Sequence, residues 1–157
     1  MNDAARPADL SLEGPIVLFD GVCNLCAGAV RFIIPLDRRG RFRFASLQSD
    51  VGRQILAGVG AEAPDPDEPP RSLILVANGR AYMRSAAALR IAAGLDRGWP
   101  LVALFLVIPA PLRDLVYRFV ARNRYRWFGK TTACDLPRDE ESWRFLDAVS
   151  GHVGRIR

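Results

Sequence analysis

The chain has 157 residues, half of them hydrophobic, and a formal net charge of +5. This length and apolar content suit one globular domain with a sizeable core, and three cysteines are too few, and odd in number, for a secreted scaffold held together by disulfides. The longest apolar run, residues 101–108, falls far short of the roughly 20 residues that span a bilayer. We therefore expect a cytoplasmic protein, and a modest positive charge does not by itself identify a nucleic-acid or membrane partner.

The first part of the chain alternates strand and helix signals. Residues 1–14 are polar and lack the apolar core of a signal peptide, so we expect a loosely held tail. The continuous apolar run at residues 16–19 predicts a strand buried on both faces, and apolar residues at helical spacing predict a helix over residues 24–37. Further along we expect a strand at 41–45, a helix at 46–57, a strand at 72–77, a hairpin at Asn78-Gly79, a strand at 80–83, and a helix at 86–93 that Ser85 could cap.

The last third of the chain is predicted to be helical. Residues 99–108 are strongly apolar, and we expect them to be buried against the sheet rather than in contact with a membrane. Residues 111–128 predict a long helix whose apolar stripe faces the core and whose arginines face outward. Trp143, Phe145, Leu146 and Val149 predict a last amphipathic helix. We expect one domain over residues 15–150, including a helical extension from about residue 99, and a tail at residues 151–157.

The order of these elements predicts the fold class. A strand, a helix, a strand and a helix are followed by two hairpin strands and a helix. This is the βαβ plus ββα pattern of a thioredoxin-like α/β domain, in which helices flank a mixed sheet, here with a C-terminal helical extension.

Two cysteines follow the first strand at the spacing that dithiol chemistry requires. Cys23 lies at the start of the predicted helix 24–37, where unpaired N–H groups and the helix dipole should lower its pKa below the usual value of about 8.5. Cys26 lies one turn later and suits a resolving role. The pair predicts a dithiol–disulfide oxidoreductase that needs no organic cofactor.

Asp20 precedes the cysteine pair at the end of the first strand. A carboxylate at this point could relay the proton of Cys26, or it could cap the helix by accepting from loop amides. The two roles remain open at this stage.

The main alternative for the cysteines is half of a zinc site. Such a site needs two more ligands, and the candidates are Cys134 and His152, which form no second paired motif. Two buried, inert thiols are a further alternative, and either would make the protein a binding or adaptor module. We expect no metal. Arginines interleaved with aromatic residues in the helix 111–128 permit a nucleic-acid surface, but a solvated helix face is the expected reading.

With these residues identified, the chain resembles the DCC family of thiol-disulfide oxidoreductases. That family is named for its Asp-x-x-Cys-x-x-Cys motif, here Asp20-Gly-Val-Cys23-Asn-Leu-Cys26. The resemblance extends to Leu47-Gln48, Arg84-Ser85, Ile108-Pro109, the segment from Tyr117 through Arg122-Asn123-Arg124 to Tyr125, Gly129-Lys130 and Cys134.

The resemblance implies a thioredoxin-like fold and disulfide exchange through Cys23 and Cys26. It also implies that Arg122 or Arg124 packs near the dithiol, where a guanidinium would stabilise a thiolate. Thioredoxins carry a cis-proline before their third strand; here either Pro70 takes that role or the feature is missing. The expected partners are a protein disulfide or a small thiol as substrate, and a separate reductase or thiol as electron source. No membrane or nucleic-acid partner is expected.

Overall fold

The computed structural model describes residues 14–21, 23–62, 73–96, 99–130 and 143–147. The two expected tails, residues 1–14 and 151–157, therefore lie almost entirely outside the described residues. In chain order the elements are β1 (Ile16–Phe19), α1 (Asn24–Leu36), β2 (Arg43–Ser46), α2 (Asp50–Gly58), β3 (Leu73–Ala77), β4 (Arg80–Met83), α3 (Arg84–Ala93), the 3-10 helix η1 (Trp99–Val107) and α4 (Ala110–Phe128).

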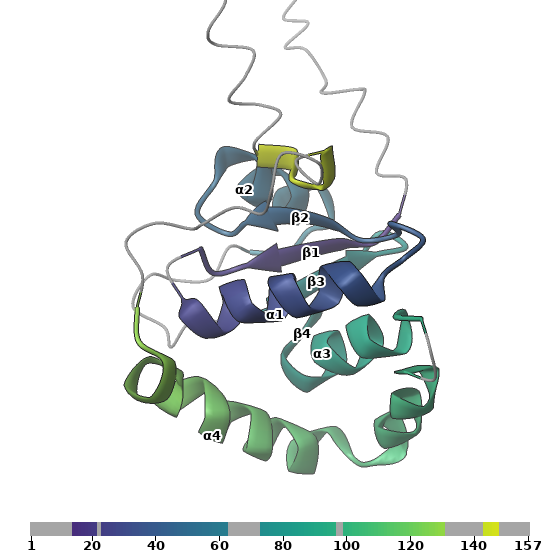
Figure 1. Cartoon of the computed structure of the whole chain (residues 1–157), viewed down its shortest axis with the longest axis vertical. Coiled ribbons are helices and arrows are strands. Elements are labelled where there is room, and N and C mark those ends of the chain that lie inside the picture. The colour runs from purple at the N-terminus through teal and green to yellow at the C-terminus, as the bar shows by residue number, and fades with distance from the viewer. Residues whose placement is uncertain (1–13, 22, 63–72, 97–98, 131–142, 148–157) are drawn as a thin grey trace, which may run out of the picture.

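The four strands form one mixed sheet in the order β2-β1-β3-β4. Strand β1 runs parallel to β2 and antiparallel to β3, and β3 pairs antiparallel with β4. Helix α2 lies on one face of the sheet, and α1 and α3 lie on the other (Figure 1). This arrangement confirms the predicted α/β, thioredoxin-like fold, with βαβ followed by ββα.

Strand β1 is buried on both faces, as its apolar run predicts. Val17 and Phe19 pack into the cluster that α1 and α3 cover, whereas Ile16 and Leu18 pack into the cluster beneath α2. Successive side chains of a strand point to opposite faces, so a strand between two helical layers must be apolar throughout. Because β1 is a central strand, the residues that follow it lie at the middle of one end of the sheet.

The β3–β4 hairpin forms as predicted, but Ser85 does not play the predicted role. Asn78 and Gly79 have φ values of 53° and 70°, the positive angles that the tight turn requires. Helix α3 already begins at Arg84, and Met83 occupies its N-cap position without a side-chain cap. The Ser85 hydroxyl instead donates to a carboxylate oxygen of Asp114, and so ties α3 to α4. The capping prediction is wrong because the serine lies within the helix.

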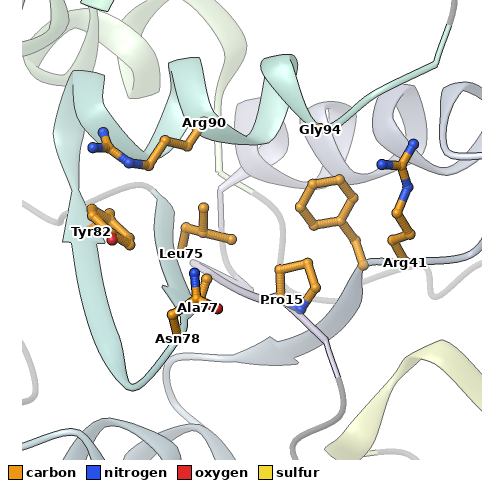
Figure 2. A pocket seen from close by; sticks show the side chains of 9 residues that line it. Pro15, Arg41, Leu75, Ala77, Asn78, Tyr82, Arg90 and Gly94 are labelled. Carbon is orange, nitrogen blue, oxygen red and sulfur yellow. The ribbon is translucent and has the colours of Figure 1, made fainter. Parts of the chain in front are cut away.

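A pocket of about 240 Å³ opens where β1 begins, at the end of the sheet away from the cysteines. Figure 2 shows its lining, where Arg90 of α3 lies above Tyr82 of β4. The guanidinium carbon is 4.2 Å from the ring centroid, a cation–π contact. The charged group in the pocket, Arg90, therefore joins α3 to β4 through its contact with Tyr82.

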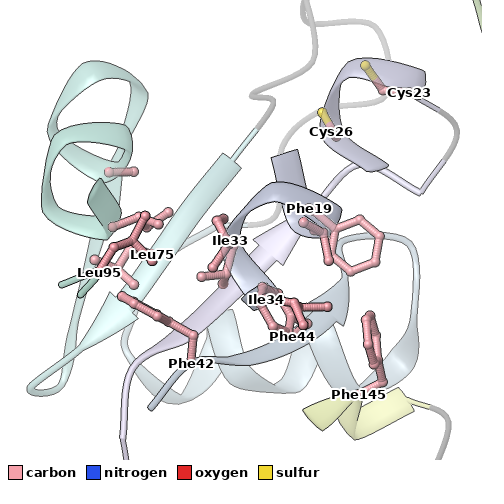
Figure 3. Close-up of a cluster of buried hydrophobic side chains, with 14 residues drawn as sticks. Phe19, Cys23, Cys26, Ile33, Ile34, Phe42, Phe44, Leu75, Leu95 and Phe145 are labelled. Atoms are coloured by element: carbon pink, nitrogen blue, oxygen red, sulfur yellow. The ribbon is translucent and has the colours of Figure 1, made fainter. Parts of the chain in front are cut away.

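The C-terminal segment at residues 143–147 packs against the outer strand β2. Phe145 forms an isolated parallel bridge with Phe44, and their rings stack at 5.4 Å between centroids (Figure 3). Next to it, Arg144 Nη1 lies 3.2 Å from Asp37 Oδ2, and both side chains are buried. The predicted helix is interrupted at Phe145, which bridges to the sheet between 3-10 helical residues 143–144 and helical residues 146–147, and its continuation to Val149 lies outside the described residues.

The apolar residues of the C-terminal extension face outward, opposite to the prediction. Leu115 and Phe119 of α4 are 62% and 60% exposed, and Leu101 and Val107 of η1 are each 79% exposed. Arg124, which the helical pattern places on the surface and the family resemblance places near the dithiol, is 0% exposed. Helix α4 forms an outer layer beyond α1 and α3 (Figure 1). Among the described residues, no helix is long and apolar enough to cross a membrane.

Candidate dithiol site

The cysteine pair lies at the start of α1, shortly after β1 ends. Cys23 is the N-cap residue of α1, with extended backbone angles, and its carbonyl accepts from the amide of Ala27 at 3.0 Å. Cys26 lies in the first turn, and Figure 3 shows both cysteines at the start of the helix, at one end of the buried cluster. Both are reduced thiols. The first N–H groups of a helix have no intrahelical acceptor, so a sulfur at this position faces their partial positive charge, which stabilises a thiolate.

The environment of Cys23 favours its thiolate. A hydrogen bond from the Cys26 thiol is the largest influence and lowers the pKa of Cys23 to about 6. Burial opposes this change, and the amides of Cys26 and Leu25 and the charge of Arg124 assist it. The sequence-based expectation of a lowered pKa thus has a specific physical basis. A pKa near 6 makes Cys23 mostly thiolate at neutral pH.

Cys26 has the opposite tendency. Its hydrogen bond to Cys23, burial, and the negative charge of the Cys23 thiolate all raise the pKa of Cys26. Arg124 counteracts them, because its Nη1 lies 3.8 Å from the Cys26 sulfur. An apolar cavity of about 190 Å³ between α1 and α4 borders Cys26. Its lining is almost entirely apolar and so does not stabilise a Cys26 thiolate. The pair thus combines one thiolate with one retained proton.

Asp20 anchors the guanidinium that faces the dithiol. Its Oδ2 accepts from Arg124 Nη2 at 3.0 Å and from the Tyr125 hydroxyl at 2.8 Å. Its Oδ1 accepts from Gln48 Nε2 at 2.8 Å. Asp20 and Arg124 are both buried, so each charge is compensated within the protein. These contacts hold Arg124 against Cys26, while the proton-relay role of Asp20 stays a prediction.

The comparisons with known proteins agree with this arrangement. Residues 17–130 match the model of the DCC1-like thiol-disulfide oxidoreductase family. The chain belongs to that family. The matched region begins in β1 and ends at Lys130, so it contains every residue of the site described above.

Two relatives of this DCC1-like protein extend the comparison. The chain is 44% identical over 131 residues to the uncharacterized protein YuxK of Bacillus subtilis, which covers 83% of this chain and 93% of that protein. It is 45% identical over 123 residues to the DCC family protein At1g52590, chloroplastic, of Arabidopsis thaliana, which covers 78% of this chain and 69% of that protein. No solved structure matches the chain.

Both thiols of this DCC1-like protein are shielded from solvent. Cys23 is 0% exposed and Cys26 is 1% exposed. The backbone of Lys130 forms an isolated antiparallel bridge with Cys23, and Asn24 Nδ2 donates to the Phe128 carbonyl at 2.9 Å. We refer to residues 128–130 as the cover segment, since they lie along the start of α1 at the thiolate.

The structure separates the two arginines that the resemblance suggested. Arg124 reaches the dithiol, whereas Arg122 is exposed on the surface of α4. Residues two apart on a helix point to different sides, so only one of the two can face the cysteines.

Tyr125, Gln48 and Asn24 were not predicted as site residues. Tyr125 and Gln48 belong to the segments that carry the family resemblance, but a single sequence gives no sign that both meet Asp20. Burial is the main cause, and the hydrogen bond to Asp20 the second, that raises the pKa of the Tyr125 hydroxyl to about 12. The hydroxyl therefore stays protonated and donates to the carboxylate.

Several of the expected features lie outside the described residues. These are Cys134, His152 and Pro70, so the zinc alternative and the cis-proline prediction are untested. Within the part of the chain that the structure describes, no group of three or more His, Cys, Asp or Glu side chains could hold a metal ion.

Proposed function

We propose that this protein is a dithiol–disulfide oxidoreductase in which Cys23 attacks a partner disulfide and Cys26 resolves the product. The observation that carries the proposal is the pairing of a low-pKa thiol at the start of α1 with a protonated thiol one turn later, beside the buried cation Arg124. An inert structural pair would not need this charge arrangement. The family to which the chain belongs supports the same reaction class.

The first step forms a mixed disulfide. The Cys23 thiolate attacks one sulfur of a partner disulfide, a bond forms between the two sulfurs, and the second partner sulfur leaves as a thiolate that takes a proton from solvent. This step consumes the negative charge on Cys23.

The second step depends on that loss of charge. The hydrogen bond to Cys23 and the charge of its thiolate are two of the three largest influences that raise the pKa of Cys26. Both disappear in the mixed disulfide, whereas Arg124 remains 3.8 Å from the Cys26 sulfur. Cys26 can then lose its proton to solvent and attack the Cys23 sulfur, which breaks the mixed disulfide, and the first partner sulfur leaves as a thiolate that takes a proton from solvent. The partner gains two electrons, and the protein retains a Cys23–Cys26 disulfide that a separate thiol or reductase must reduce.

Exchange also requires Cys23 to become accessible, and we propose that the cover segment moves to expose it. Cys23 is 0% exposed, and a partner sulfur must approach it along the line of the disulfide that it attacks. The contacts at Asn24 and Lys130 hold the cover segment to α1, and their release would open the thiolate. We place this reaction in the cytoplasm, where the reductants that maintain thiols are present.

The decisive experiment is a trap. In a Cys26→Ala variant, the mixed disulfide on Cys23 cannot be resolved, so incubation with oxidised glutathione and with a model protein disulfide should leave each partner attached to Cys23. Mass spectrometry of tryptic peptides identifies the site. A Cys23→Ala variant, which keeps Cys26, is the matched control and should trap far less.

Failure of the trap has a clear reading. If Cys26→Ala acquires no partner on Cys23 although it is folded by circular dichroism, the proposal is wrong, and the adaptor alternative with inert cysteines takes its place. The unchanged chain, purified without chelator, should be assayed for zinc by atomic emission, since stoichiometric zinc would indicate a metal-holding module instead.

A further inference from the structure

The outer layer of the molecule exposes many apolar side chains. We call those of η1 and of one side of α4 the outer apolar face. Its most exposed members include Leu104, Val107, Leu112, Leu115, Val116 and Phe119, each at least 60% exposed. Single exposed apolar residues are ordinary, but a surface of this extent on a soluble domain indicates an interaction site.

The spacing of α4 shows that this exposure is a property of the whole helix. Leu112, Leu115, Val116 and Phe119 follow the i, i+3, i+4, i+7 pattern of one helix side. The Phe119 and Trp127 rings meet at 5.7 Å between centroids, which extends the same side toward the end of the helix. The opposite side carries Arg124 toward the dithiol. The inner side of α4 thus carries the buried Arg124 beside apolar residues such as Val120 and Ala121, and a second apolar side faces outward.

A row of positive charge borders this surface. Arg118, Arg122 and Arg126 are exposed and lie four residues apart, so they line one edge of the apolar side. Asp114 is the only acid of α4, and it is engaged inward by Ser85 and, at 3.9 Å, by Arg84. Helix η1 contains no charged residue. The described residues of η1 and α4 therefore combine apolar area with positive charge, and neither helix supplies an outward-facing acid to compensate it.

We propose that η1 and α4 dock the protein on the surface of a membrane that contains anionic lipid. Helices that lie in a bilayer interface have aromatic and leucine side chains on one side and arginines beside them, whose charge meets lipid phosphates. The long arginine side chains can keep their stems along the apolar face while the guanidinium groups reach the headgroups. This replaces the expectation, based on the sequence, that residues 99–108 are buried against the sheet.

The charge pattern favours a lipid surface over a second copy of the chain. Two copies packed antiparallel through this face would place the same arginine row of each against the other, which like-charge repulsion disfavours. An anionic bilayer instead complements the row. Because α4 also supplies Arg124 to the dithiol, docking through its outer side would hold the dithiol site close to the membrane.

The test is co-sedimentation of the full chain with sonicated vesicles. Vesicles of phosphatidylcholine with about 30% phosphatidylglycerol are compared with vesicles of pure phosphatidylcholine. We expect the anionic vesicles to pellet several times more protein, and about 0.5 M NaCl to reduce this fraction because it screens the arginines.

Three variants separate the contributions. Leu115→Ser with Phe119→Ser should abolish pelleting without a change of charge. Arg118→Gln with Arg126→Gln should reduce it severalfold. Arg53→Gln with Arg80→Gln removes the same charge from α2 and from the start of β4, and should leave pelleting close to that of the unchanged chain.

Each other outcome overturns the proposal. Folded protein that stays in the supernatant with anionic vesicles at low salt has no such surface. Equal loss in the control pair would mean that net charge alone acts. A lipid-free dimer, seen by light scattering and lost on Leu115→Ser with Phe119→Ser, would assign the outer apolar face to a second copy instead.

Discussion

The Nη1 of Arg124 lies 3.8 Å from the sulfur of Cys26, although the two residues are 98 positions apart in the chain. The same guanidinium pairs with Asp20 through Nη2 at 3.0 Å. A buried cation with one buried carboxylate compensates its own desolvation and still directs positive potential toward the thiols. The relationship joins the C-terminal extension to the chemistry of the first strand and helix, so α4 is part of the site.

The first prediction concerns the pH dependence of Cys23. Only the thiolate reacts with iodoacetamide, and the pKa of Cys23 is lowered to about 6. The alkylation rate should therefore rise through about pH 6, level off above it, and fall as the pH drops and the sulfur is protonated. Mass spectrometry of the Cys23 peptide at a series of pH values measures the midpoint. A rate that still climbs steeply at pH values near 9, about where an ordinary thiol ionises, would contradict it.

The same profile tests the cause of the low pKa. The hydrogen bond from Cys26 is the largest influence that lowers it. Cys26→Ala should thus move the midpoint upward, whereas Cys26→Ser, which keeps a donor, should move it less. If both variants keep the midpoint of the unchanged chain, the hydrogen bond from Cys26 does not lower the pKa of Cys23.

The second prediction isolates the charge of Arg124. Arg124→Met should raise the Cys23 midpoint, because the guanidinium stabilises its thiolate, and Arg124→Lys should restore part of the shift. Arg122→Met, on the exposed side of α4, should give no measurable shift. A shift with Arg122→Met as large as that with Arg124→Met would reassign the role.

Arg124→Met should also destabilise the fold. It leaves Asp20 buried without its cation, a change that typically costs about 3 kcal/mol or more, although Tyr125 and Gln48 still donate to the carboxylate. Urea unfolding measures the loss. The double variant Asp20→Asn with Arg124→Met should recover part of it, because no unpaired charge then remains.

Local patterns in the sequence were sufficient for the core of the fold. The apolar run of β1, the helical spacing of α1 and Asn78-Gly79 each fix their structure through neighbours in the chain, and the structure confirms them. The position of Cys23 at the start of α1 follows in the same way, because the apolar run of β1 ends at Phe19 and the helical spacing of α1 begins just after Cys23.

The surroundings of the dithiol could not be predicted in this way. A helical pattern gives the relative directions of side chains but not which side faces the protein, and the assumption that apolar residues face inward is wrong for α4. Arg124 is buried because Asp20, Tyr125 and Cys26 contact it, and Asp20 and Cys26 lie 104 and 98 positions before it in the chain. Ser85 shows the same limit, since its partner Asp114 lies on another helix.

The third prediction concerns access to Cys23. Asn24 Nδ2 holds the carbonyl of Phe128 in the cover segment at 2.9 Å. Loss of one such hydrogen bond removes about 1 kcal/mol, so Asn24→Ala should raise the plateau alkylation rate about fivefold while the pH midpoint stays near that of the unchanged chain. The rate is measured above the midpoint, where ionisation is complete.

A matched variant controls for the loss of an asparagine. Asn123 Nδ2 donates to Phe119 within α4, away from the cover segment. Asn123→Ala should leave the plateau rate within a factor of about two, the effect of about 0.4 kcal/mol. If both variants react at the rate of the unchanged chain, the cover segment does not limit access.

The fourth prediction concerns the C-terminal segment at β2. Phe145 is 1% exposed, stacks on Phe44 and meets Phe19 edge-on at 6.4 Å between centroids. Phe145→Ala removes the ring and leaves a cavity, so it should lower the free energy of unfolding by about 3 to 5 kcal/mol, and Phe145→Leu by about 1.5 kcal/mol or less. Urea unfolding followed by circular dichroism measures both. Because Phe145 lies outside the dithiol, the Cys23 alkylation midpoint of the folded Phe145→Leu protein should stay near pH 6. A loss below about 1 kcal/mol for Phe145→Ala would mean that residues 143–147 do not complete the core.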